Sequence, residues 1–235
     1  MKNKTPDFAY HMTKFFTEYL PIQRNLSPNS IATYRDTFRL LLLFYDTEKH
    51  IKPNLLTLDM LNVQQIEDFM LWLKKERNCG ASTCNQRLGA LKSFFRYLQF
   101  ALPDCALQCQ ENLAIRPMKQ PEPGLKYLTI DGIKLLLEQP DIKTKYGRRD
   151  LAILSLMYDT GARVQEIADI KIVHIRFSAP ATIRITGKGD KTRVVPLLSR
   201  TEDILKQYIK DFKIDAGGND AYLFQNRSGQ QLSRF

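Results

Sequence analysis

Hydrophobic residues in the first hundred positions recur at the spacing of amphipathic helices. Over 28–45, apolar side chains return every three or four residues, after Ser27 as a candidate N-cap and Pro28 at the first helical position. The same spacing predicts three more helices, over about 7–20, 63–75 and 82–100. The sequence therefore predicts a helical bundle at the N-terminal end.

A segment rich in proline and glycine then interrupts this pattern. Residues 116–127, RPMKQPEPGLKY, contain three prolines and a glycine, which disfavour regular structure and favour an extended tether. We therefore divide the chain into a helical domain over 1–115, a linker over 116–127 and a second domain over 128–235.

The helical pattern resumes beyond the linker. Helices are predicted over about 129–139, capped by Thr129, and over about 147–159, where Gly161 can end the helix in the left-handed conformation. After residue 170 the spacing of the apolar residues changes from the 3.6 residues of a helix to the 2 residues of a strand, in the β-branched segments KIVHIRF, ATIRIT and TRVVPL. These three segments predict a three-stranded antiparallel sheet, so the fold class is α+β and mainly α.

A last helix and a short strand are predicted at the C-terminal end. The helix covers about 201–212, and Ser199 with Glu202 fits a capping box. The strand is YLF, over 222–224, followed by a turn at Ser228 and Gly229.

Charge narrows the choice of partner. The chain has 35 lysines and arginines against 25 aspartates and glutamates, a net charge of +10. This excess favours a polyanion, with nucleic acid ahead of an anionic membrane. Because no apolar run reaches the roughly 18 residues of a membrane span and the first residues lack a secretory signal pattern, we expect a cytoplasmic protein without a membrane partner.

The four cysteines leave a zinc site open in principle. Cys79, Cys84, Cys105 and Cys109 lack the Cys-x-x-Cys spacing of a zinc knuckle, and Cys84 falls on the apolar stripe of a predicted helix. We therefore expect reduced thiols and no metal or other cofactor.

Two cationic features could meet on one phosphate. Arg163 enters a helix just after Gly161, where a guanidinium fork and a helix N-terminus both favour an anion. The predicted hairpin tip TGKGDKTR has two glycines, which let a turn approach a ligand closely, and carries Lys188 and Lys191 at its apex. A plainer interpretation stays open for each, because Arg163 could simply pair with Glu166 and the tip could be a solvated turn.

The predicted bundle also carries a group of basic residues on its polar faces. They either form a DNA-facing surface or belong to ordinary solvated helix faces. These residues are Arg35, Arg39, Arg87, Lys92 and Arg96.

Two sequences make a resemblance specific. YDTGARVQEIADI followed by IRITGKGDKTRVVPL resembles the catalytic domain of the tyrosine recombinase (phage integrase) family, and SPNSIATYRDTFRLLLLFY with STCNQRLGALKSFFRYLQ resembles that family's SAM-like core-binding domain. The resemblance covers nearly the whole chain. It implies a site-specific recombinase that binds duplex DNA and breaks and rejoins it through a 3′-phosphotyrosyl intermediate.

The resemblance assigns roles to individual residues. Arg163 matches the first catalytic arginine, which binds the scissile phosphate, and Glu166 matches the acidic residue that supports it. Lys188 matches the hairpin lysine that protonates the leaving 5′ oxygen, whereas Lys191 and Arg193 are expected to contact DNA nearby.

The sequence departs from the family pattern in its second half. The family also has a His-x-x-Arg box and a tyrosine nucleophile, yet none of the three histidines has arginine three residues later. We therefore expect a C-terminally truncated catalytic domain, inactive and monomeric by itself, from an enzyme that forms a tetramer on DNA. The alternatives are a naturally short, non-catalytic DNA-binding protein derived from a recombinase and, more remotely, a type IB topoisomerase.

Overall fold

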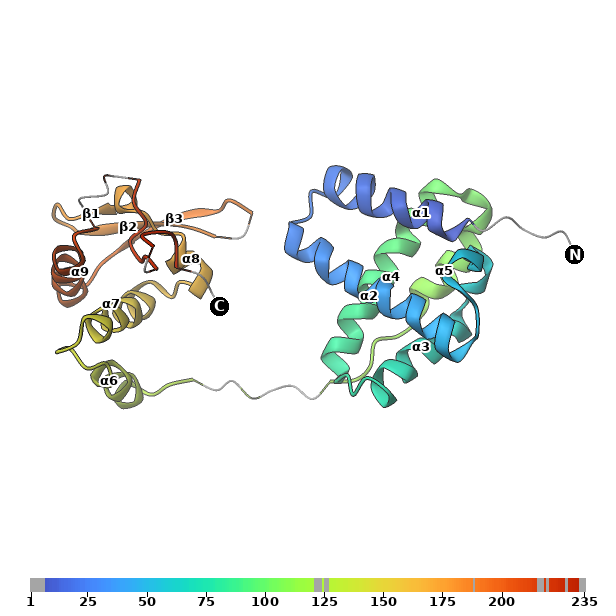
Figure 1. Cartoon of the computed structure of the whole chain (residues 1–235), viewed down its shortest axis with the longest axis horizontal. Helices are drawn as coiled ribbons and strands as arrows, with labels where there is room; N and C mark the ends of the chain where they lie inside the picture. Colours follow the sequence, from blue (N-terminus) through green and yellow to red (C-terminus); the bar gives the residue numbers. More distant parts are fainter. Residues whose placement is uncertain are drawn as a thin grey trace, which may run out of the picture. The chain divides into compact units, whose positions relative to one another are not determined.

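The computed structural model describes residues 7–120, 124, 127–187, 189–214, 218, 220–226 and 228–232. By its internal contacts the chain divides into two compact units, Met1–Gly124 and Leu125–Phe235 (Figure 1). Within the described residues, no helix is both long enough and apolar enough to cross a membrane.

The first unit is helical, as predicted. Its helices are α1 (Phe8–Lys14), which continues as a π-helical segment (Phe15–Gln23), α2 (Pro28–Glu48), α3 (Val63–Lys75), α4 (Ala81–Ala101) and α5 (Ala106–Ala114). Short 3-10 turns cover Pro53–Leu55, Leu58–Met60 and Pro103–Cys105. Ser27 caps α2 by accepting the Ser30 amide at 3.4 Å, so the start predicted for this helix is confirmed.

Two features of this unit differ from the expectation. The first helix widens into π-helical turns from Phe15, in the segment that contains Pro21, which has no amide hydrogen for a regular helical bond. The sequence pattern did not predict α5, whose few apolar residues show no clear period. Contacts with other segments hold it instead, because Asn112 is buried and donates to the Leu61 carbonyl at 2.9 Å.

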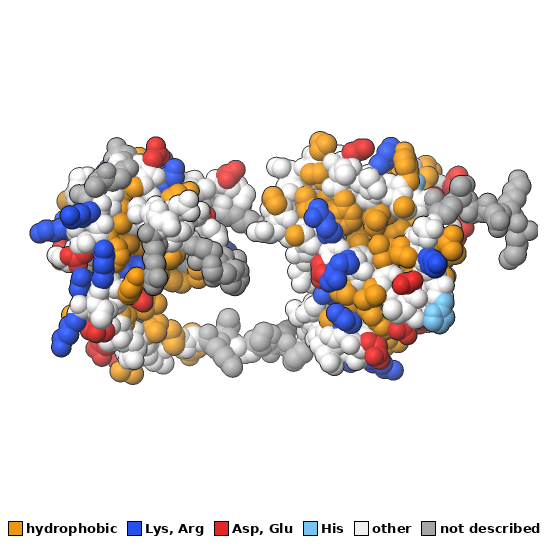
Figure 2. Space-filling model, viewed as in Figure 1, with side chains coloured by type: hydrophobic (Ala, Val, Ile, Leu, Met, Phe, Trp, Pro, Cys, Tyr) orange, Lys and Arg blue, Asp and Glu red, His pale blue; other side chains and the backbone are white. Residues whose placement is uncertain are grey.

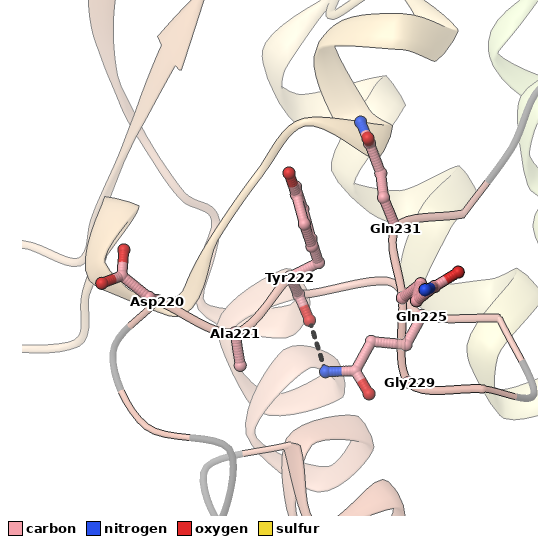
Figure 3. A pocket seen from close by; sticks show the side chains of 7 residues that line it. Asp220, Ala221, Tyr222, Gln225, Gly229 and Gln231 are labelled. Atoms are coloured by element: carbon pink, nitrogen blue, oxygen red, sulfur yellow. Dashed lines mark hydrogen bonds between the residues drawn. The ribbon is translucent and has the colours of Figure 1, made fainter.

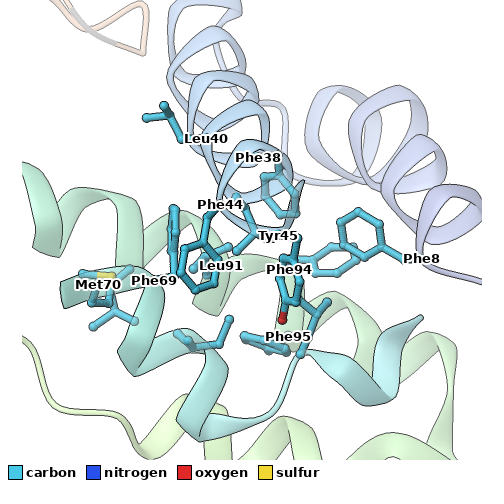
Figure 4. Close-up of a cluster of buried hydrophobic side chains, with 14 of the residues drawn as sticks. Phe8, Phe38, Leu40, Phe44, Tyr45, Phe69, Met70, Leu91, Phe94 and Phe95 are labelled. Carbon is cyan, nitrogen blue, oxygen red and sulfur yellow. The ribbon is translucent and has the colours of Figure 1, made fainter. Parts of the chain in front are cut away.

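Aromatic and aliphatic side chains together form the core of the first unit (Figure 4). Phe38 of α2 meets Phe94 of α4 edge-on, with 5.2 Å between ring centroids, and Phe8 of α1 meets Phe94 at 5.8 Å. The buried Tyr45 keeps its hydroxyl satisfied by donating to the Met60 carbonyl at 2.7 Å. Helices α1, α2 and α4 therefore share one apolar centre.

The second unit combines helices with a small sheet. Its elements are α6 (Ile130–Glu138), α7 (Lys145–Thr160), α8 (Val164–Ala168), β1 (Ile175–Arg176), β2 (Thr182–Thr186), β3 (Thr192–Pro196) and α9 (Ser199–Phe212). The sheet is antiparallel in the order β1-β2-β3, with Ile183 opposite both Ile175 and Val195. The predicted fold class and three-stranded sheet are confirmed.

The core of this unit lies between its helices and the sheet. Leu156 of α7, Ile183 of β2 and Leu205 of α9 are fully buried in one cluster. Tyr208 joins them and donates its hydroxyl to the Leu223 carbonyl at 3.1 Å. This packing holds α7 and the sheet together, so the segments that follow each of them have fixed places.

Three local predictions for this unit were wrong. The first predicted strand is reduced to two residues, because Lys171 donates its amide to His174 Nδ1 at 3.1 Å and Ile172–His174 forms a 3-10 turn. The segment 222–224 makes only an isolated bridge, between Tyr222 and Lys171.

The predicted capping box at the start of α9 is also wrong. The N-cap is Leu198, whose own amide donates to Asp159 Oδ2 at 2.9 Å, and Glu202 pairs with Lys206 at 2.7 Å. The turn at Ser228 and Gly229 is present, since Gly229 has a φ of 74° and donates its amide to the Asn226 carbonyl.

Candidate functional site

Arg163 lies two residues after the glycine that ends α7. Gly161 has a φ of 58°, a left-handed conformation that favours glycine, and its amide donates to the Met157 carbonyl at 2.9 Å. The chain therefore turns sharply, and Arg163 becomes the N-cap residue of α8. Its side chain is 77% exposed. The guanidinium is thus open to a ligand and is not enclosed between packed helices.

Glu166 gathers three hydrogen bonds on one buried carboxylate. The residue is only 5% exposed. Its Oε2 accepts from the Arg163 amide at 3.1 Å and from Arg193 Nη2 at 2.8 Å, and its Oε1 accepts from Arg163 Nη1 at 2.9 Å. The Arg193 bond and then the Arg163 amide lower the pKa of Glu166 to about 2, so the carboxylate is ionised at neutral pH.

The charges of this cluster leave it net positive. One carboxylate faces two guanidinium groups, and Arg163 donates from Nη1 to Glu166 while its side chain stays 77% exposed. A planar guanidinium held in this way is preorganised to bind a phosphate through two oxygens. The ion pair between Arg163 and Glu166, which the plainer interpretation predicted, is therefore present, and it is compatible with anion binding.

The β2–β3 hairpin reaches the same cluster. Gly187 follows β2 and donates its amide to the Lys191 carbonyl at 2.9 Å, which closes the hairpin end. A Cβ atom on Gly187 would lie 2.7 Å from Glu166 Oε1. Lys191 is exposed at this end, and Arg193 of β3 is half-buried because it pairs with Glu166. Lys188 lies outside the described residues.

The predicted basic residues of the first unit do not all present free charge. Asp36 pairs with Arg39 and with Arg87, each at 2.9 Å. The hydrogen bond from Arg39, followed by the one from Arg87, lowers the pKa of Asp36. The Arg87 side chain is only 16% exposed, whereas Arg39 and Arg35 are exposed. Arg87 is therefore held mainly within the protein, and Arg35 and Arg39 remain accessible.

Lys92 is likewise engaged inside its own unit. Its Nζ donates to the Ile115 carbonyl at 2.6 Å, and burial, followed by the nearby Arg96, lowers its pKa. Arg96 itself is exposed. Figure 2 shows lysine and arginine side chains spread over the visible faces of both units. Of the five basic residues predicted here, Arg35, Arg39 and Arg96 are best placed to meet a ligand.

A separate hollow in the second unit lies outside this cluster (Figure 3). It has a volume of about 850 Å³, and its lining includes Asp220, Tyr222, Gln225 and Gln231. Gln225 donates to the Tyr222 carbonyl at 3.0 Å. The hollow contains none of the predicted site residues.

The cysteines are all free thiols, and Cys84 and Cys109 are buried. In the described part of the chain, no group of three or more histidine, cysteine, aspartate or glutamate side chains could hold a metal ion.

The sequence pattern did not predict that Gly187 and Arg193 contact Glu166. As one of the two glycines of the predicted hairpin tip, Gly187 is expected only to allow the turn, yet it continues the inward row of Ile183 and Ile185 on β2. Arg193 was predicted only as a DNA contact, yet the register places it opposite the buried Ile185. The alternation of side chains along a strand could have shown that both positions face the core.

Comparison with known proteins gives a consistent result over both units. Residues 14–100 match the phage integrase N-terminal SAM-like domain, and residues 126–235 match the phage integrase family. A Sinorhizobium fredii protein named as integrase/recombinase y4rC is 34% identical over 230 residues, which are 98% of this chain and 68% of that protein. Tyrosine recombinase XerD of Listeria innocua is 31% identical over 225 residues, 93% of this chain and 72% of that protein.

A solved structure has the same fold. The XerH site-specific recombinase, bound to its difH substrate in a pre-cleavage complex, superposes with a TM-score of 0.65 at 24% identity. The match covers 90% of this chain and 60% of that chain.

Proposed function

The chain belongs to the phage integrase family, the tyrosine recombinases, and we propose that it binds duplex DNA for a site-specific recombination reaction. In that reaction strands are broken and rejoined through a 3′-phosphotyrosyl intermediate. The observation that carries this proposal is the exposed guanidinium of Arg163, oriented by a buried and ionised Glu166. A phosphate is the anion that such a fork at a helix N-terminus fits best.

In the proposed mechanism each residue has one task. Arg163 binds the scissile phosphate and stabilises the negative charge that the pentacovalent transition state gathers, while Glu166 holds Arg163 in place. One oriented donor of this kind contributes about 3 kcal/mol to transition-state stabilisation. Lys188 donates a proton to the leaving 5′ oxygen as a general acid.

The remaining basic residues supply affinity for the DNA backbone. In the second unit these are Lys191 and Arg193, the latter 39% exposed and able to share its guanidinium between Glu166 and a phosphate. In the first unit Arg35, Arg39 and Arg96 make direct contacts, whereas Arg87 and Lys92 contribute less because protein groups already hold them. We further propose that a domain over 1–115 and a domain over 128–235 contact DNA as separate bodies, joined by the linker 116–127.

We propose that these 235 residues alone bind DNA but do not cut it. The three histidines, His11, His50 and His174, are not followed by arginine at the third position, so a His-x-x-Arg box is lacking. Tyr208 is buried and hydrogen-bonded, and burial raises its pKa to about 12, which disfavours the phenolate of a nucleophile. We expect this chain to be a monomer in solution, and we propose that a catalytically complete recombinase of this kind acts as a tetramer on DNA.

The test combines a binding and a cleavage assay. Fluorescence anisotropy with a mixed-sequence duplex of about 30 base pairs should show binding that weakens steeply between about 50 and about 300 mM salt, because phosphate contacts release counterions. A suicide substrate that traps a phosphotyrosyl adduct should give none with this chain. Affinity independent of salt would contradict the DNA-binding proposal, and a trapped adduct would contradict the lack of cleavage.

A further inference from the structure

Two segments far apart in the sequence meet on the carboxylate of Glu166. From the start of α8, the Arg163 amide and guanidinium donate to it. From the β2–β3 hairpin, Arg193 donates to Oε2 at 2.8 Å, across 27 positions of sequence. Since each carboxylate oxygen accepts a bond from an arginine side chain, the place of Glu166 depends on both segments.

Gly187 completes this contact from the hairpin side. A Cβ at this position would lie 2.7 Å from Glu166 Oε1, 3.5 Å from its Cδ and 3.7 Å from Arg193 Nη1. A carboxylate at the end of a flexible side chain usually moves aside for a methyl group, but this one is buried and held by three donors. The glycine is therefore needed for the close approach of the hairpin end to Glu166.

The contact also reaches the tip of the hairpin. Gly187 binds the Lys191 carbonyl at 2.9 Å, and the Thr186 and Thr192 hydroxyls lie 3.1 Å apart across the two strands. The base of the tip is thus closed where it rests on Glu166. Any shift of Glu166 would move Arg163 on one side and this closed base on the other.

We propose that Gly187 and Arg193 are positioning residues that fix the β2–β3 hairpin against the start of α8 through the carboxylate of Glu166. The phosphate-binding arginine and the base of the hairpin tip, formed by Thr186, Gly187, Lys191 and Thr192, are thereby placed relative to each other before DNA arrives. This inference rests on the proposed function for the importance of Arg163, but the contact itself exists in the free protein. Neither residue needs to touch the reacting atoms for this role.

The test uses the 235-residue chain, with the backbone amide of Arg163 as the reporter. Gly187→Ala and Arg193→Gln should each shift the Arg163 amide resonance in a 15N-correlated spectrum, because both displace the carboxylate that this amide binds. The matched control is Arg184→Gln, which removes an exposed arginine from the neighbouring strand β2 and should leave the Arg163 amide unchanged.

A double variant separates this contact from general damage. In a Glu166→Ala background the methyl group of Gly187→Ala meets no carboxylate, so it should add no further shift and no further loss of DNA affinity. With Glu166 present, Gly187→Ala changes no charge yet should weaken binding of the mixed-sequence duplex by about threefold to tenfold, the scale of one charged contact. If Gly187→Ala fails to fold, the double variant should restore folding, and failure to restore it would overturn the inference.

The two readouts fail independently. An Arg163 amide that does not respond to Gly187→Ala in a folded protein would refute the positioning role, whatever the DNA affinity. An amide that responds supports the positioning contact, and if Arg163→Ala then leaves DNA affinity unchanged, it is the proposed phosphate-binding role of Arg163 that fails.

Discussion

Replacing Arg163 with alanine should separate a ligand-binding arginine from a structural one. Its side chain is 77% exposed and forms an ion pair with Glu166. After the substitution Glu166 still accepts from Arg193 and from the backbone amide of residue 163. Because the Arg163 end of the pair is exposed and the buried carboxylate keeps two other donors, the free energy of unfolding should fall by about 1 kcal/mol or less, the scale of an exposed ion pair.

The same substitution should change the salt dependence of DNA binding. Losing one phosphate contact reduces the slope of log affinity against log salt by about 0.9. Between about 50 and about 300 mM salt this amounts to roughly a fivefold change in the ratio of the wild-type and variant dissociation constants. The effect should be largest at low salt, where the lost contact releases a counterion most favourably.

The assay must report on the correct unit. The chain has a single tryptophan, Trp72, which lies in α3 of the first unit, so its fluorescence does not follow unfolding around Arg163. Urea unfolding should therefore be followed by far-UV circular dichroism, with separate transitions fitted for the two units. Anisotropy titrations at four or more salt concentrations give the slope.

Arg193→Ala provides the contrast. It removes the donor that contributes most to the low pKa of Glu166 and leaves a buried carboxylate short of a partner, which should cost about 2 kcal/mol or more. If Arg163→Ala were as destabilising as Arg193→Ala and left the salt slope unchanged, Arg163 would be a structural residue and our interpretation of the site would be refuted.

Three further outcomes are expected. The folded-state pKa of Glu166 is about 2, below its ordinary 4.5, so its stabilising contribution is complete above pH 4.5 and is lost as the pH falls towards 2. In Glu166→Gln the free energy of unfolding should therefore depend less on pH in this window. An unchanged dependence on pH would contradict the assignment. Gly147→Ala places a Cβ against the Asp141 carbonyl oxygen, a backbone clash that should destabilise the second unit by about 1–3 kcal/mol in thermal unfolding. Burial raises the pKa of the Cys109 thiol to about 11, so a thiol reagent at pH 8 should modify Cys79 well before Cys109, and equal rates would contradict this.

Local signals in the sequence determined the main elements. Ser27 with Pro28 predicted the start of α2, Thr129 predicted the start of α6, and Gly161 predicted the end of α7. Each of these signals acts through hydrogen bonds within a few residues, so it can be read without knowledge of the rest of the fold. The pairing of Arg163 with Glu166 is also local, because the two residues are three positions apart on the first turn of α8.

Long-range contacts decided what the sequence pattern missed. The predicted capping box at Ser199 is replaced by a bond from Leu198 to Asp159, which lies 39 positions earlier. Arg87 and Lys92 had the pattern of exposed basic residues, but the folded unit sets them against Asp36 and the Ile115 carbonyl. In the same way, Arg193 and Gly187 meet Glu166 only because packing brings the hairpin to the start of α8. A pattern along the chain shows which face of an element is buried, whereas the partner across the interface is selected by how those faces pack.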